Sequence, residues 1–253
     1  MTVRDFYEKL ETIIPKELSE PWDNDGLLCC SDDTKDIKKV LVSLDVTEEI
    51  VDYALSEGFD LIISHHPLIF RPVSSITMDN NVSRKLIKLI SAGVSVISFH
   101  TRADKVRGGV NDCLAKLLGL YDVKPFGEDA LGRIGHLESE MGFEDFALFV
   151  KDALGAEHIV AADAYAPVYT VALVGGDGKD YVAAAAEAGA DTYVSGRISY
   201  NIMEEAPETG LNLIEAGHYA TEFPVTDFFA NLVGKIDPRA YVEIVGSNML
   251  RIL

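Results

Sequence analysis

Apolar runs of strand length alternate along this chain with segments whose apolar residues recur at helical spacing. Up to residue 118 the pattern predicts strands at 40–44, 61–63 and 94–99, and helices at 6–14, from 47 onwards, at 84–92 and at 111–118. A loop is expected at 121–131. Beyond it the pattern predicts strands at 133–138, 170–174, 192–194, 211–214 and 241–245, and helices at 143–154, 181–188 and 224–234. Helices between strands that are apolar throughout are typical of βαβ crossovers and of sheets covered on both faces.

This order of elements predicts an α/β fold of two lobes, with largely parallel or mixed sheets flanked by helices. The 253 residues suit two small lobes, and the loop-like stretch at 121–131 marks the change from one to the other. We expect residues 1–125 to form the first lobe, completed by the C-terminal segment 220–253, and residues 126–219 to form the second lobe.

The chain is strongly acidic, with 41 acidic against 22 basic side chains and a formal net charge of −19. Such a surface repels phosphate backbones, so nucleic acid is disfavoured as the main partner, whereas cations are favoured. No apolar stretch approaches the roughly 20 residues of a membrane span, and the first residues lack the apolar run of a signal peptide. We therefore expect a cytoplasmic protein with no membrane partner. Its three cysteines form no CxxC pair, and we expect them to be reduced.

Histidines follow three of the predicted strands. His65 and His66 come after the second strand, His100 after the third, and His218 just beyond the strand before last. In open α/β sheets ligands bind beyond the carboxyl ends of the strands, so residues remote in sequence can converge there. A lone histidine at a strand end is more often an ordinary loop residue, but three such ends together favour a metal site.

Two of these histidines have a carboxylate four residues further on, Asp104 after His100 and Glu222 after His218. A spacing of four puts both side chains on one side if the segment makes a helical turn. Imidazole and carboxylate ligands without cysteine favour zinc, iron or manganese, and a carboxylate can bridge two such ions. The pattern therefore predicts a site for divalent cations.

Other motifs have more than one interpretation. The segment from Gly175 to Lys179 follows a strand and precedes a helix, where backbone amides can hold an anion. It lacks the spacing of a P-loop, so a tight turn is the better interpretation. Trp22 either packs its ring on the core at a turn or belongs to the wall of a binding crevice. His136 and His158 are expected to be structural.

Four stretches carry a resemblance to a known family. They are residues 22–27 (WDNDGL), 64–70 (SHHPLIF), 100–112 (HTRADKVRGGVND) and 217–222 (GHYATE). In this order they resemble the GTP cyclohydrolase 1 type 2 homologues, also called the NGG-one-interacting-factor-three-like family, and the resemblance extends over nearly the whole chain. It implies a two-lobed α/β protein with a dinuclear metal centre in the crevice between the lobes, assembled as a homohexamer.

The resemblance also implies roles for single residues. The metal ligands carried over from it are His65, His66, Asp104, His218 and Glu222, with Glu222 the expected bridge between the ions. His100 lies at the position of a motif histidine beside the ligands, and its implied role is catalytic or supporting. The family motif usually has an acid where Arg197 stands and a histidine where Asn201 stands, so substrate recognition there departs from the pattern.

Two functions of different classes follow from the resemblance. The first is a metal-dependent hydrolase that opens the imidazole ring of GTP or performs a related hydrolysis on a nucleotide or other small molecule. Two divalent ions would activate water, and His100 would carry a proton because imidazole exchanges protons near neutral pH. Arg102, Lys105 or Arg197 would offset the repulsion between an acidic protein and a triphosphate. The second is a non-catalytic, metal-binding oligomeric scaffold or regulator, which the departures at Arg197 and Asn201 favour.

Overall fold

The chain divides by its internal contacts into two compact units in this computed structural model, which describes residues 1–251. Unit 1 comprises Met1–Val106 and Val225–Leu250, and unit 2 comprises Arg107–Pro224. These boundaries differ from the expected ones at 125 and 219. Helix α5 (Val110–Leu117) and strand β5 (Tyr121–Phe126), expected in the first lobe, belong to unit 2, because β5 pairs with β6 of that unit.

Unit 1 is built on a five-stranded sheet with the order β1-β4-β3-β2-β11. Its strands are β1 (Gly26–Cys29), β2 (Lys39–Ser43), β3 (Leu61–Ser64), β4 (Ser95–Ser98) and β11 (Tyr241–Ile244). Only β1 runs antiparallel to its neighbour. All four residues of β3 and of β4 are buried, in keeping with the apolar runs that predict central strands covered on both faces.

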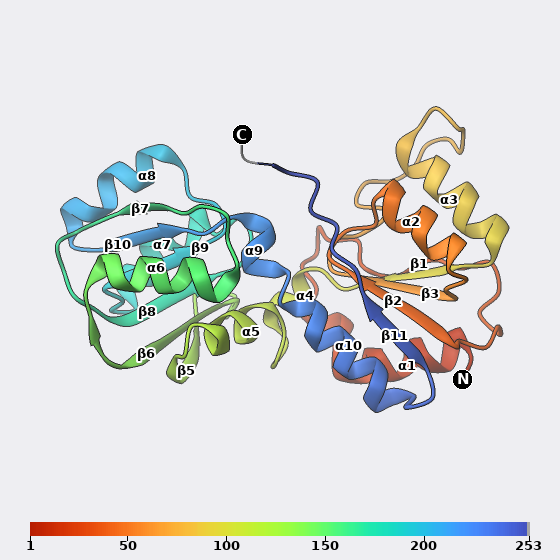
Figure 1. Cartoon of the computed structure of the whole chain (residues 1–253), viewed down its shortest axis with the longest axis horizontal. Coiled ribbons are helices and arrows are strands. Elements are labelled where there is room, and N and C mark those ends of the chain that lie inside the picture. The colour runs from red at the N-terminus through yellow and green to blue at the C-terminus, as the bar shows by residue number, and fades with distance from the viewer. Residues whose placement is uncertain (252–253) are drawn as a thin grey trace. The chain divides into compact units, whose positions relative to one another are not determined.

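Helices cover both faces of this sheet, with α2 and α3 on one face and α1 and α10 on the other (Figure 1). The helices of unit 1 are α1 (Val3–Ile13), η1 (Lys16–Leu18), α2 (Glu48–Ser56), α3 (Asn81–Ala92), α4 (Thr101–Lys105) and α10 (Val225–Ile236). The side chains of Thr2, Thr47 and Asn80 each accept a backbone N–H in the first turn of α1, α2 and α3, and so fix where these helices begin.

Unit 2 is built on a six-stranded sheet with the order β5-β6-β8-β9-β10-β7. The strands besides β5 are β6 (Gly132–Met141), β7 (Val160–Ala162), β8 (Val168–Val174), β9 (Thr192–Ser195) and β10 (Asn212–Glu215). The middle strands β8, β9 and β10 are parallel, and the outer pairings are antiparallel. Both sheets are therefore mixed, as the fold prediction allows.

The helices of unit 2 also lie on both faces of their sheet, where they cover two separate apolar clusters. They are α5, α6 (Phe143–Leu154), η2 (Lys179–Tyr181), α7 (Val182–Glu187), α8 (Tyr200–Glu205), η3 (Ala206–Thr209) and α9 (His218–Glu222). The expected loop at 121–131 is wrong for β5, where five of six residues are exposed and no apolar pattern marks the strand. Among residues 1–251, no helix combines the length and the apolar character that crossing a membrane requires.

Candidate metal centre

The candidate ligands of unit 1 lie where three parallel strands end. Strands β2, β3 and β4 are in register, so that Ser43, Ser64 and Ser98 are paired at their carboxyl ends. The chain continues from β3 into His65 and His66, and from β4 through Phe99 into His100. The ends of the two neighbouring strands β3 and β4 thus bring these histidines together, as the position of ligand sites in α/β sheets predicts.

The imidazoles of His65, His66 and His100 form one cluster. Each can offer a ring nitrogen, and the three nitrogens lie within 4.8 Å of one another. The ring centroids are 5.0 Å apart for His65 and His66, 5.3 Å for His65 and His100, and 5.8 Å for His66 and His100. His65 is fully buried, whereas the other two side chains are partly exposed.

Each imidazole in this cluster is held through its Nδ1 atom. The Nδ1 of His65 lies 2.9 Å from the carbonyl oxygen of Phe99, that of His66 lies 2.7 Å from a carboxylate oxygen of Asp45, and that of His100 lies 3.0 Å from one of Asp23. A carbonyl or carboxylate oxygen can only accept, so each Nδ1 carries the proton and donates it. In the neutral imidazole the lone pair then lies on Nε2, which is the tautomer that a metal ligand or a proton acceptor needs.

Asp23 is a fixed anion behind His100. Its side chain is fully buried, and its carboxylate accepts the backbone N–H of Thr101 at 3.0 Å and the hydroxyl of Thr101 at 2.7 Å. Burial alone would raise the pKa of the Asp23 carboxyl, but the hydrogen bonds from His100 and Thr101 hold it well below its usual range. The orientation of the His100 ring is therefore imposed from the loop before β1.

Asp104 lies on α4, the short helix that follows His100, with its Oδ1 atom 3.7 Å from Nε2 of His65. The two basic residues expected to add positive charge beside it have other partners. Arg102 is fully buried and donates to Asp25 at 3.0 Å and to Glu11 at 2.6 Å, and Lys105 forms an ion pair with Glu20. Arg102 therefore does not offer its charge to a bound phosphate.

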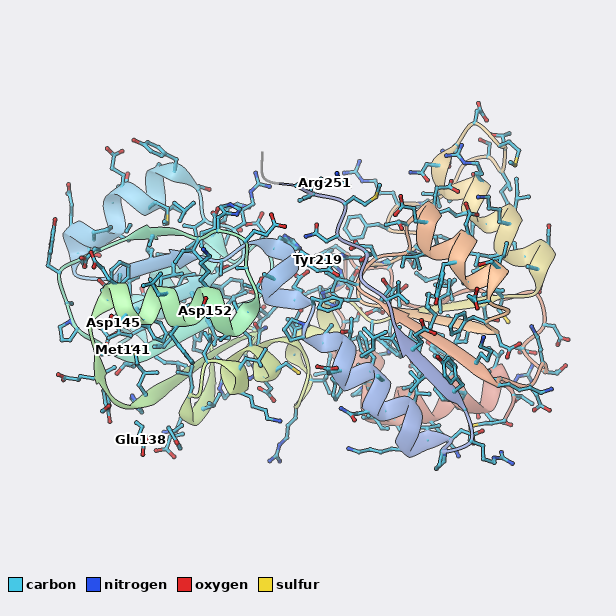
Figure 2. The ribbon with its side chains drawn as sticks, in the orientation of Figure 1. Glu138, Met141, Asp145, Asp152, Tyr219 and Arg251 are labelled. Carbon is cyan, nitrogen blue, oxygen red and sulfur yellow. The ribbon has the colours of Figure 1, made fainter. Side chains whose placement is uncertain are left out.

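Unit 2 carries the other two candidate ligands on α9. The Nε2 atom of His218 lies 3.0 Å from Oε2 of Glu222, one helical turn further on, and Glu222 is 5% exposed. Tyr219, labelled in Figure 2, follows His218 on this helix and stacks on Phe223. The spacing of four residues thus makes the helical turn that brings imidazole and carboxylate together.

A glycine loop after β8 packs directly against this pair. Gly176 has a φ of +68°, and a Cβ atom on it would overlap Oε1 of Glu222, so glycine is required there. The amides of Gly175, Gly176 and Gly178 donate to the side chains of Asn111, Thr221 and Ser195. Because these amides have partners inside unit 2, the segment from Gly175 to Lys179 is a tight turn and not an open anion cradle.

The supporting residues are the part of the site that sequence reasoning missed. Asp45 follows β2 at the same distance as His66 follows β3, so the strand-end rule contains a signal for it. Ser247, in the segment after β11, donates its hydroxyl to the Asp45 carboxylate at 3.0 Å, and no local pattern marks this contact. His136 stacks on Tyr169 and its Nδ1 lies 3.2 Å from the Thr170 hydroxyl, contacts that agree with the structural role expected of it.

Fold and strand ends together define the class of this protein: a two-unit α/β protein with metal-ligand residue types gathered at the ends of parallel strands. The Duf34/NIF3 (NGG1p interacting factor 3) profile matches residues 1–250, and the chain belongs to that family. A Clostridium perfringens relative called GTP cyclohydrolase 1 type 2 homolog is 37% identical over 232 residues, which cover 89% of this chain and 88% of that protein.

Solved structures agree with this assignment. A Staphylococcus aureus protein has a TM-score of 0.88 at 27% identity, covering 100% of this chain and 99% of that one. Reduced HcgD from Methanocaldococcus jannaschii has a TM-score of 0.84 at 29% identity, covering 96% and 97%. The family resemblance and the α/β fold are therefore confirmed. That His65, His66, Asp104, His218 and Glu222 share one dinuclear centre stays a prediction.

Proposed function

We propose that this protein is a metal-dependent hydrolase that acts on a heteroaromatic ring, in the manner of GTP cyclohydrolase 1 type 2 or in a related hydrolysis. One observation carries the proposal: the Nδ1 atoms of His65, His66 and His100 each lie at hydrogen-bond distance from an oxygen acceptor, so that in the neutral rings the lone pair that binds a cation or a proton is on Nε2. The names of the curated relatives support the same chemistry.

The donor set fits divalent metal ions. Neutral imidazoles held by a carboxylate or carbonyl, together with further carboxylates, are typical ligands of zinc, iron and manganese. Two such ions would be held by the five predicted ligands, namely His65, His66, Asp104, His218 and Glu222. When bound, the ions supply Lewis acidity and lower the pKa of water to near neutrality.

His100 is the proposed proton carrier in this reaction. Its Nε2 takes a proton from the water that adds to the ring carbon and gives it to the ring nitrogen that was double-bonded to that carbon. It then takes the hydroxyl proton of this adduct and gives it to the second nitrogen, which leaves as the carbon–nitrogen bond breaks and a carbonyl group forms. Asp23 keeps the other proton on Nδ1 and stabilises the imidazolium that forms, as a buried carboxylate does in catalytic triads. Asp45 and the Phe99 carbonyl orient His66 and His65 without taking part in proton transfer.

The test is a comparison of His65→Ala with His158→Ala, a control on an exposed histidine of unit 2. We expect the metal content per chain and the rate of GTP turnover to fall at least roughly tenfold in His65→Ala. Both should stay at the parent level in His158→Ala. Turnover of GTP and other nucleotides that is absent, or that is equal in parent and His65→Ala, would refute the hydrolase.

A second candidate function, the non-catalytic scaffold or regulator, is favoured by Arg197 and Asn201, both of which are exposed. In this case the parent protein binds metal but does not turn over GTP. If the departures caused the loss, the double variant Arg197→Glu, Asn201→His gains metal-dependent turnover. A parent that is active and unaffected by the double change rules this candidate out.

The homohexamer and the cytoplasmic location belong to the same proposal. Light scattering that gives a monomer at micromolar concentration would contradict the hexamer. Fractionation of cells that places the protein outside the cytoplasm would contradict the location.

A further inference from the structure

Two large aromatic side chains lie exposed beside the imidazole cluster of unit 1. Trp22 is 61% exposed and Phe70 is 46% exposed, and their ring centroids are 6.2 Å apart. Both contact the ring of His100, with centroid distances of 6.2 Å from Trp22 and 6.0 Å from Phe70. Apolar rings left in water are costly, so their position next to the candidate proton carrier calls for a physical reason.

The two loops that carry these rings are fixed. Asn24 donates its side-chain N–H to the carbonyl oxygen of Ile69, which ties the loop of Trp22 to that of Phe70. Asp23, between Trp22 and Asn24, is anchored to Thr101 by two hydrogen bonds. The backbone segments that carry the two aromatic rings are therefore held in place before any ligand arrives, which lowers the entropy cost of binding.

The three rings meet edge to face. The planes of Trp22 and Phe70 are inclined at 74°, and His100 is inclined at 77° to Trp22 and at 89° to Phe70. Because the exposed rings meet edge to face and do not stack, their contact leaves the opposite faces of both rings uncovered by each other. A planar ring can therefore stack on one of them and present its edge to the others, an arrangement that aromatic groups prefer.

We propose that Trp22 and Phe70 form a subsite for a planar heteroaromatic ring, such as a purine base, and hold it beside Nε2 of His100. An aliphatic ligand would gain burial there but no stacking, which every base offers through its π face. A neutral ring is favoured over an anionic one, because Asp23 lies behind His100 and the chain carries a net charge of −19. This assignment rests on the proposed function in one respect, namely that the ring bound in the subsite is the ring that reacts.

Trp22 is the chain's single tryptophan, so its fluorescence reports directly on this subsite. Guanosine is the probe, because it has the planar base without the charge of a phosphate, and ribose is its non-aromatic counterpart. We expect guanosine to quench the emission saturably in both metal-loaded and metal-stripped full-length protein, after correction for absorbed light, and ribose to have no effect. Phe70→Leu should weaken guanosine binding roughly tenfold.

The matched control is Tyr165→Leu, which removes an aromatic ring that is 95% exposed in unit 2 and should leave binding unchanged. Guanosine that fails to quench, or that binds Phe70→Leu as tightly as the parent, would overturn the subsite. The subsite would also be refuted if the Trp22 emission changed with protein concentration and not with guanosine concentration, because a second copy of the chain would then cover the rings. Quenching in metal-stripped protein separates the two proposals. Quenching without GTP turnover in the metal-loaded protein would support the subsite and refute the hydrolase. GTP turnover without quenching would support the hydrolase and refute the subsite.

Discussion

Two helices of five residues, α4 in unit 1 and α9 in unit 2, carry candidate ligands and occupy equivalent places in their units. Each follows the third of three parallel strands, β2-β3-β4 in unit 1 and β8-β9-β10 in unit 2. At the start of α4, His100 precedes Asp104 by four residues, just as His218 precedes Glu222 on α9. One local plan therefore places imidazole and carboxylate in both units.

The two helices differ in what holds them. Helix α4 is anchored by buried charge, with Arg102 bound to Asp25 and Glu11. Helix α9 is anchored by close backbone packing, where Gly176 and Gly196 leave no space for a side chain. The difference teaches that the same ligand geometry can be kept either by electrostatic partners distant in sequence or by the absence of a Cβ atom.

The largest effect is expected where buried charge anchors α4. Arg102→Leu leaves Asp25, a fully buried carboxylate, with Lys16 as its remaining cation, and should lower the free energy of unfolding by about 3 kcal/mol. Arg239→Leu is the control, because its side chain is 83% exposed beside Asp237 and solvent-exposed pairs contribute little to stability. Urea unfolding measures both. Equal losses in the two variants would show that burial of the Arg102 charge does not matter.

The next effect concerns the packing against α9. A Cβ atom on Gly196 would lie 2.6 Å from the carbonyl oxygen of Gly176 and 2.8 Å from Cα of His218, and these backbone atoms cannot move aside. Gly196→Ala should therefore cost roughly 2 kcal/mol of stability and displace His218.

Gly234→Ala is the counterpart for this change. Gly234 lies in α10, and a methyl group added to it would have no atom within 4 Å, so alanine should stabilise the protein by about 0.5–1 kcal/mol. Thermal unfolding of both variants is the measurement. A Gly196→Ala protein as stable as the parent would contradict the close packing proposed for α9.

Asp45 tests the long-range support of the unit 1 imidazoles. Asp45→Asn removes the negative charge that holds Nδ1 of His66 and should lower the affinity for a divalent ion by about 10–100-fold. Competition with a chelating dye measures the affinity for Zn²⁺ or Mn²⁺. Asp52→Asn, at a carboxylate that is 61% exposed on α2, is the matched control and should bind as the parent does. An unchanged affinity in Asp45→Asn would mean that the carboxylate does not support a metal ligand.

The fold follows from the sequence where apolar runs are long, as in β2 and β8, whose last four residues are all buried. It does not follow for β5, because an exposed edge strand has no apolar face to reveal it. For the same reason the predicted boundary between the units at residue 125 differs from the observed one. Strand β5 joins β6 by backbone pairing, which leaves no mark on the side-chain pattern.

The candidate site was predictable as a set of strand-end histidines, because the topology of parallel strands alone brings His65, His66 and His100 to one edge. Their partners were not, since Asp23 reaches His100 from 77 residues away and Ser247 reaches Asp45 from 202 residues away. Such contacts depend on how loops approach in space, and no spacing rule contains them.

The smallest effect is expected at a carboxylate that links neighbouring parallel strands, of which each unit has one. Asp60, which directly precedes β3, accepts the backbone N–H groups of Lys38 and Lys39. Asp191, which directly precedes β9, accepts those of Tyr169 and Thr170. Asp60 also forms an ion pair with Lys35 at 3.0 Å.

Burial alone would raise the pKa of Asp60, but the Lys38 N–H and the Lys35 ammonium hold it below its usual value. A lowered folded-state pKa adds stability that is complete above the unfolded value near pH 4 and is lost as pH falls through the folded value. Asp60→Asn should therefore cost about 1 kcal/mol at neutral pH and flatten the acid limb of the stability profile. Unfolding midpoints between neutral and acid pH measure this, and an acid limb as steep in Asp60→Asn as in the parent would assign the loss to other carboxylates.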